Sequence, residues 1–193
     1  MRTAKVKRET LETRVEVEID LDGTGKGNVW TGVKFLDHQL RTLSKHSLID
    51  LDIKAEGDLS HHIIEDVALT LGEALTKALG KKKGIFRFGW AIAPMDDSLV
   101  LVSIDIGGRS YVALDLNLEE STIEDMESED IEHFLFSFAQ TSKMNLHAKI
   151  LYGENSHHKA EALFKALALS LRQAVSIDPR RGESEVPSLK GKL

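Results

Sequence analysis

Apolar and polar residues alternate along the N-terminal part of the chain, which predicts a β-strand over residues 9–21. One side of this strand is almost entirely apolar and consists of Leu11, Thr13, Val15, Val17, Ile19 and Leu21. The even positions between them carry charge. A period of two residues is that of a strand with one buried face. The stretch 22–28 contains three glycines and is predicted to be a turn or flexible loop.

After this loop the apolar period lengthens to that of a helix. Apolar residues at positions 36, 40 and 43 predict a helix over 35–48, and a short alternating run predicts a strand over 49–55. A second helix is predicted from residue 61 to about residue 79. Ser60 is its expected N-cap and Gly80 its expected end.

The second half of the chain shows the same order of helix, strand and helix. Three strands precede it in the prediction, over 91–93, 99–106 and 111–116. An acidic loop follows over 119–130. The helix, strand and helix are then predicted over 131–142, 145–152 and 157–175, with Ser156 as the N-cap of the last helix.

A paired motif, the His-His-x-x-Glu cassette, marks this repetition. His61-His62 is followed by Glu65, and ninety-six residues later His157-His158 is followed by Glu161. A shift of 95 residues also places His38 on His133. We therefore expect an α+β fold built by tandem duplication, with helices on one face of each sheet. The expected divisions are a first repeat over 1–88, a second over 89–177 and a tail over 178–193.

Histidine and glutamate at these spacings indicate metal binding. Successive residues on a helix are about 100° apart, so His61 and Glu65 share a face while His62 points away. We expect each cation to take His and Glu from one helix and the off-face His from the other repeat. With His38 and His133 added, each of two sites has three His and one Glu. Such a site leaves coordination positions open for a substrate.

A lone His on a helix is usually a structural or solvated residue. Here six of eight histidines fall at matching positions in two repeats, which favours metal ligation. His46 has no counterpart, so we interpret it as a surface or packing residue. His147 is a candidate partner of a metal ligand. The ligand types do not distinguish Mn, Fe, Co, Ni and Zn.

Composition narrows the class of protein further. The 193 residues carry a formal net charge of −6 and contain no cysteine. The chain therefore has no basic excess for nucleic acid, no disulfide and no thiolate ligand. No apolar run is long enough for a membrane span, and no signal peptide is recognisable, so we expect a cytoplasmic protein. Arg87, Arg109 and Lys190 are candidate anion contacts.

Motifs along nearly the whole chain resemble those of the imidazoleglycerol-phosphate dehydratase family. They occur in the family's order and are Arg8-Glu9-Thr10-Leu11-Glu12-Thr13, Phe35-Leu36-Asp37-His38, His61-His62-Ile63-Ile64-Glu65-Asp66, Arg87-Phe88-Gly89, Pro94-Met95-Asp96-Asp97, Gly108-Arg109, the stretch 133–138, Asn155-Ser156-His157-His158-Lys159-Ala160-Glu161 and Pro187-Ser188-Leu189-Lys190-Gly191.

The resemblance implies a hydro-lyase of histidine biosynthesis that converts D-erythro-imidazole-glycerol phosphate to imidazole-acetol phosphate with two Mn²⁺ ions. It implies halves of the ribosomal protein S5 domain 2-like type, trimers, and a shell of about 24 subunits. The implied metal ligands are His38, His61, His62, Glu65, His133, His157, His158 and Glu161. The implied substrate contacts are Glu12, Gln39, Arg87, Arg109, Ser188 and Lys190.

The reaction needs a group that moves a proton, and carboxylates are the candidates. Glu12 is our first choice, with Asp97 and the metal-bound Glu65 or Glu161 as alternatives. At position 39 the family usually has Met, whereas this chain has Gln39. A buried amide would need a hydrogen-bond partner, so this difference bears on local substrate contacts.

Two other functions are compatible with the same ligands. A di-metal hydrolase would use them to activate water, and it would need a carboxylate bridging the two ions. A non-catalytic metal-binding shell protein would have no use for the basic residues. Turnover of imidazole-glycerol phosphate before and after chelation would distinguish these possibilities.

Overall fold

The computed structural model describes residues 1–182 and 185–193. The first half forms one sheet and two helices. Its strands, in the sheet order β1-β2-β4-β3, are β1 (Thr3–Glu9), β2 (Thr13–Asp20), β4 (Asp50–Gly57) and β3 (Gly27–Trp30). Its helices are α1 (Lys34–Ser47) and α2 (Ser60–Leu79).

The second half repeats this plan. Its sheet has the order β5-β6-β10-β7, with β5 (Phe88–Met95), β6 (Ser98–Asp105), β10 (Asn145–Tyr152) and β7 (Tyr111–Asp115). Its helices are α3 (Ser128–Ser142) and α4 (Ser156–Val175). In both halves the strand before the last helix pairs antiparallel with one neighbour and parallel with the other. The predicted α+β class and tandem duplication are confirmed.

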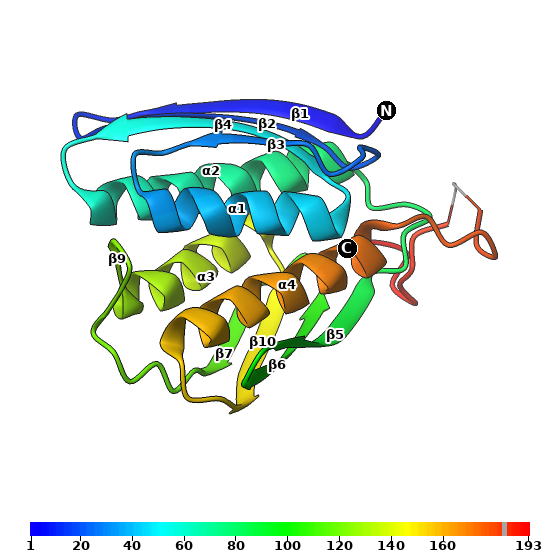
Figure 1. Cartoon of the computed structure of the whole chain (residues 1–193). Coiled ribbons are helices and arrows are strands. Elements are labelled where there is room, and N and C mark those ends of the chain that lie inside the picture. The colour runs from blue at the N-terminus through cyan, green and yellow to red at the C-terminus, as the bar shows by residue number, and fades with distance from the viewer. Residues whose placement is uncertain (183–184) are drawn as a thin grey trace.

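All four helices lie between the two sheets (Figure 1). Because each helix buries one face on its own sheet, the other face is free to pack against a helix of the opposite half. The helices α2 and α3 pair in this way, as do α1 and α4. The contact between α2 and α3 is close at Gly72, where a Cβ atom would lie 2.6 Å from the carbonyl oxygen of Phe138. This four-layer arrangement brings the two repeats together along their helices.

The predicted N-terminal strand was wrong in its first residues. The chain forms β1 and β2 with a turn between them, and Thr10 Oγ1 accepts hydrogen bonds from the backbone of Glu12 and Thr13 at 3.1 and 3.0 Å. Leu11, expected on the buried face, is fully exposed at this turn. From Thr13 onward the alternation is as expected, with Val15 and Val17 fully buried. Strand β3 lies partly in the stretch predicted as a loop.

The acidic stretch predicted as a loop contains a small hairpin instead. It consists of β8 (Thr122–Ile123) and β9 (Met126–Glu127). Ile123 and Met126 are buried, which anchors this otherwise polar segment. Two apolar side chains in such a short run produce no recognisable period, so the pattern alone could not reveal the hairpin.

The starts of α2 and α4 also differ from the prediction by one residue. Leu59 and Asn155 are the N-caps of α2 and α4, and Ser60 and Ser156 are the first helical residues. Asn155 caps α4 by accepting a hydrogen bond from the backbone of His158 at 3.1 Å. Gly80 ends α2 as predicted. No helix of the described residues is long and apolar enough to cross a membrane.

Candidate metal centres

The first group of metal-ligand side chains joins α2 to α3, and we call it the α2–α3 cluster. It consists of His61, Glu65 and His133, whose candidate ligand atoms lie within 4.8 Å of one another. The His133 Nε2 atom is 3.6 Å from Glu65 Oε1, and the rings of His61 and His133 are 4.9 Å apart. His61 and Glu65 meet here because they share one face of α2.

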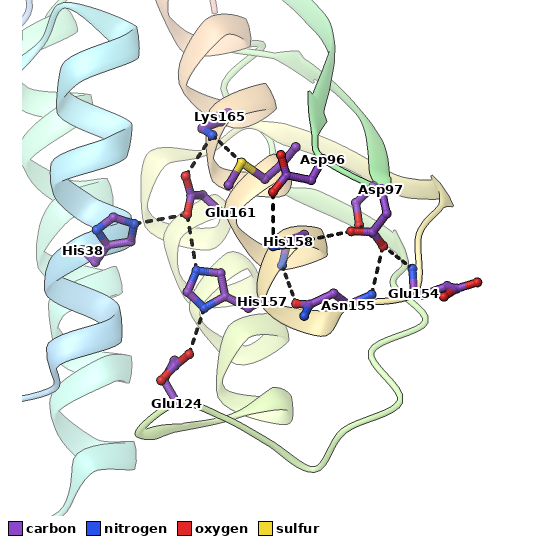
Figure 2. A network of polar contacts seen from close by, with 12 residues as sticks. His38, Asp96, Asp97, Glu124, Glu154, Asn155, His157, His158, Glu161 and Lys165 are labelled. Carbon is purple, nitrogen blue, oxygen red and sulfur yellow. Dashed lines mark hydrogen bonds and ion pairs between the residues drawn. The ribbon is translucent and has the colours of Figure 1, made fainter.

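The second group joins α1 to α4, and we call it the α1–α4 cluster. It consists of His38, His157 and Glu161 (Figure 2). The Glu161 Oε2 atom lies 3.2 Å from His38 Nε2 and 3.4 Å from His157 Nε2. Each cluster therefore takes a His and a Glu from one repeat and a His from the other. Six of the eight predicted ligands are brought together in this way.

The donor set of the α2–α3 cluster suits a divalent cation. The His133 Nε2 atom is buried and has no hydrogen-bond partner among the described residues. Such an atom is costly to bury unless something binds it. A metal ion held by His61, Glu65 and His133 would supply the missing contact.

Within a single chain, the off-face histidines do not join the α2–α3 or the α1–α4 cluster. His62 lies beside Asp58 and Glu12, and His158 lies beside Asp96 and Asp97, so neither joins a cluster. Being about 100° from the preceding His, each points away from the contact between the helices. Both lie against hairpins of the sheets, β1–β2 and β5–β6, that present acidic residues.

Every cassette histidine has a carboxylate on its Nδ1 atom, and the sequence did not reveal this. The Nδ1 groups of His61, His62, His157 and His158 donate to Asp130, Asp58, Glu124 and Asp97 at 2.5, 2.8, 3.0 and 2.5 Å, respectively. A carboxylate there fixes the proton on Nδ1 and leaves Nε2 as the metal ligand. Asp58, four residues before His62, was detectable from its spacing. Glu124 and Asp130 carry no such signal.

The carboxylates differ in their surroundings. Burial would raise the pKa of Glu161, but hydrogen bonds from Lys165 and His38 outweigh it and lower that pKa to about 2. The pKa of Asp97 lies far below its usual range because His158 and the backbone N–H groups of Glu154 and Asn155 donate to it. The hydrogen bond to Asp58 raises the pKa of His62.

The structure does not bring Gln39 to a surface. Its side chain is fully buried on α1, so it has no access to a substrate in this conformation. The predicted substrate contact at position 39 is therefore not supported. His147 lies on the predicted strand, β10, against Tyr111, with ring centroids 5.8 Å apart. Among the described residues it forms no hydrogen bond with a cassette histidine, so its candidate role as partner of a metal ligand is not supported.

The predicted anion contacts lie at the end of the second half opposite to the α1–α4 cluster. Arg87 pairs with Asp105 at 2.6 Å and donates to the carbonyl oxygen of Pro187 at 2.9 Å. The tail carrying Ser188 and Lys190 thus lies beside Arg87 and the C-terminal end of α4 (Figure 1). Residues 183–184 of the predicted tail lie outside the described residues.

These basic residues are far from the metal clusters of the same chain. The backbone N–H of Arg87 donates to the carbonyl of Ala174 at 2.9 Å. Ala174 and His157 are 17 residues apart on α4. At about 1.5 Å per residue this places them about 25 Å apart. A small phosphorylated molecule could not reach both groups within one copy of the chain. Arg109 lies exposed in the turn before β7, where its carbonyl accepts from Asn145.

Comparisons with known proteins agree with this geometry. Residues 31–171 match the family described as imidazoleglycerol-phosphate dehydratase. Proteins of that name from Dehalococcoides mccartyi strain CBDB1 and Methanothermobacter thermautotrophicus are 52% and 51% identical. The matches cover 100% of this chain and 97% and 98% of those proteins.

Solved structures of similar proteins share the fold. The Pyrococcus furiosus protein in complex with (S)-C348 is 39% identical with a TM-score of 0.85, and the match covers 97% of this chain and 100% of that one. The enzyme from Staphylococcus aureus is 30% identical with a TM-score of 0.84, covering 91% and 99% of the two chains. The sequence match and the shared fold show that the chain belongs to the imidazoleglycerol-phosphate dehydratase family of hydro-lyases, and the paired clusters agree with this.

Proposed function

We propose that the chain removes water from D-erythro-imidazole-glycerol phosphate to form imidazole-acetol phosphate in histidine biosynthesis, with two Mn²⁺ ions. The observation that carries this proposal is the pair of His and Glu clusters, one on each pair of helices. His38, His157 and Glu161 would hold one ion, and His61, Glu65 and His133 the other. Two equivalent sites suit a substrate ring with two nitrogens.

The proton removed in this reaction is not acidic in the free substrate, because it lies on the second glycerol carbon from the imidazole and no carbonyl group adjoins that carbon. When bound, the cations would act as Lewis acids that stabilise the ring as imidazolate and so favour loss of the hydroxyl group from the carbon attached to the ring. The chain's own residues must hold the ions and provide a carboxylate that accepts the carbon-bound proton.

Glu12 is the carboxylate that best suits this role. It lies on the β1–β2 turn with its side chain exposed, and its Oε2 atom is 3.7 Å from His62 Nδ1. Asp97 and Glu161 are weaker bases, because their hydrogen bonds hold their pKa values low. Glu65 is committed to the α2–α3 cluster.

Replacing Glu12 tests this assignment. Glu12→Gln keeps the size of the side chain but removes the base, so turnover should fall by about 100-fold or more while Mn²⁺ binding is retained. Glu56→Gln, on an exposed position of β4, is the control and should leave turnover unchanged. Wild-type turnover in Glu12→Gln would rule out Glu12 as the base.

We propose that the complete site is assembled from neighbouring copies, in trimers and a shell of about 24 subunits. Two features support this: the outward-facing His62 and His158, and the separation of Arg87 from the metal clusters. Co-assembly of two inactive variants, His61→Ala and Arg87→Ala, should then restore part of the activity. If one copy supplied every group, the mixture would stay inactive.

Metal removal tests the main proposal. Chelation should abolish turnover of imidazole-glycerol phosphate, and added Mn²⁺ should restore it. Turnover that survives complete removal of metal would contradict the proposal. A hydrolase with a bridged pair of ions is less well supported, because each cluster contains its own glutamate, Glu65 or Glu161, from a different helix.

A further inference from the structure

The two metal clusters come from equivalent positions of a repeat, so their surroundings can be compared residue by residue. In the α2–α3 cluster, His61 donates to Asp130, which is only 4% exposed. Asp130 lies on α3, the helix that also carries His133. Among the described residues, Glu65 forms an ion pair only with His133. Its neighbour one helical turn later is Leu69.

The α1–α4 cluster has a lysine side chain at the position equivalent to Leu69. The shift of 96 residues that relates the cassettes places Lys165 on Leu69. Lys165 Nζ lies 2.8 Å from Glu161 Oε1, so the ammonium group already occupies one oxygen of the carboxylate (Figure 2). A metal ion at this cluster must share Glu161 with Lys165 and experiences its positive charge.

The carboxylate that accepts from Nδ1 of the first cassette histidine, His61 or His157, also differs between the two clusters. The shift of 95 residues places Asp130 on Phe35, and the Phe35 ring lies 5.1 Å from that of His157. The carboxylate on His157 Nδ1 is supplied instead by Glu124, at the turn between β8 and β9, with a side chain 60% exposed. An exposed side chain on a turn restrains an imidazole less than a buried one on a helix.

The off-face histidines do not introduce a comparable difference. His62 and His158 each have an aspartate on Nδ1, Asp58 and Asp97, in the loop before α2 and in the hairpin β5–β6. The difference between the two clusters therefore rests on Lys165, Phe35 and the position of the acid on His157.

We propose that the α2–α3 cluster binds a divalent cation more tightly than the α1–α4 cluster, so the two ions load in order. Lys165 and the exposed Glu124 weaken the second site, and the buried Asp130 strengthens the first. This inference rests on the proposed function, which requires both sites to hold metal.

Titration of the metal-free full-length protein with Mn²⁺ tests it, with free Mn²⁺ followed by its electron paramagnetic resonance signal. Two binding steps should appear, separated by at least about tenfold in dissociation constant. Lys165→Leu, which installs the residue of the first repeat, should tighten the weaker step. Leu69→Lys should weaken the tighter step. Leu169→Lys, on an exposed position of α4 two turns beyond Glu161, is the control and should change neither step.

Two further variants identify which cluster each step belongs to. Asp130→Asn should weaken the tighter step, and Glu124→Gln should weaken the weaker one, each by about tenfold. Two equal steps in the wild type, or a weaker step unchanged in Lys165→Leu, would overturn the inference while leaving the proposed function intact. A protein that binds no Mn²⁺ would overturn both.

Discussion

Gln39 is an amide buried in the interior face of α1. Its side chain is 0% exposed, and neither Nε2 nor Oε1 has a hydrogen-bond partner among the described residues. The neighbouring buried positions on α1 include Leu36 and Leu40. Burying polar atoms without partners reduces stability, so this position carries a cost that an apolar residue would avoid.

Gln39→Met should therefore stabilise the protein. Methionine has a similar length and shape, and it removes the unpartnered amide, so the free energy of unfolding should rise by about 1–3 kcal/mol. Chemical denaturation of the metal-free protein measures this. Gln140→Met, at an exposed position of α3, is the matched control and should have little effect. A loss of stability in Gln39→Met would show that the amide has a partner in solution.

Lys82 is another buried polar residue, and its effect on the stability of the folded protein depends on pH. It is 5% exposed, and its Nζ atom donates to the Ile106 carbonyl at 3.5 Å. Burial, with the nearby charge of Lys143, lowers the pKa of Lys82 below its usual value of 10.5. Between the lowered pKa and 10.5 the unfolded chain binds more protons than the folded one. Stability therefore rises with pH across this window.

Lys82→Met should remove this dependence. The variant should be more stable than the wild type at neutral pH, because no charge is buried, and the difference should shrink as the pH approaches 10.5. Unfolding by denaturant at several pH values measures it. Lys81→Met, at the neighbouring exposed position, is the control and should follow the wild-type pH profile. A constant difference between Lys82→Met and wild type would contradict the prediction.

At the scale of elements, the β8–β9 hairpin contacts both helices of the α1–α4 cluster. Asp125 accepts hydrogen bonds from the backbone N–H groups of Lys34 and Phe35, both at 2.8 Å, and so caps α1 from 90 residues away. The adjacent Glu124 contacts His157 of α4. No local residue caps α1, because its N-cap Val33 has no side-chain hydrogen bond.

Asp125→Ala should lower the free energy of unfolding by about 1 kcal/mol, because two backbone donors at the start of α1 lose their acceptor. Asp125→Asn, which keeps one acceptor oxygen, should lose less. Denaturation of the metal-free protein measures both, with Glu119→Ala as an exposed control. Equal stability of Asp125→Ala and Glu119→Ala would show that this cap contributes nothing.

Elements with a repeated apolar pattern were predictable, and those with only one or two buried side chains were not. The four helices were placed within three residues of their observed starts, because an apolar period repeated over several turns is a strong signal. Strands β1, β3, β8 and β9 were missed. Their residues are held by pairing with distant strands or by single buried side chains such as Ile123, and neither produces a local pattern.

At the scale of the whole molecule, the contact between the helix layers decides whether the clusters form. Gly72 lets α2 approach α3, since a Cβ atom there would lie 2.2 Å from Thr141 Oγ1 and 2.6 Å from the Phe138 carbonyl oxygen. The same two helices carry His61 and His133.

Gly72→Ala should therefore destabilise the protein by about 1–3 kcal/mol, although alanine favours helices, because the clash with the backbone of α3 outweighs that gain. Mn²⁺ binding by the α2–α3 cluster should weaken at the same time. Denaturation and Mn²⁺ titration measure the two effects, and Glu73→Ala is the control for helix propensity alone. A more stable Gly72→Ala variant would show that the layers can separate freely.

The sequence by itself determined the duplication, the α+β class and the six residues that form the two clusters, because repeats and helical spacing are local properties of the chain. Only the tertiary structure decided how these ligands are grouped. Packing places α2 on α3 and α1 on α4, so each cluster draws on both repeats, and it turns His62 and His158 outward. It also supplies Asp130 and Glu124, since contacts between residues distant in sequence depend on how the two halves pack.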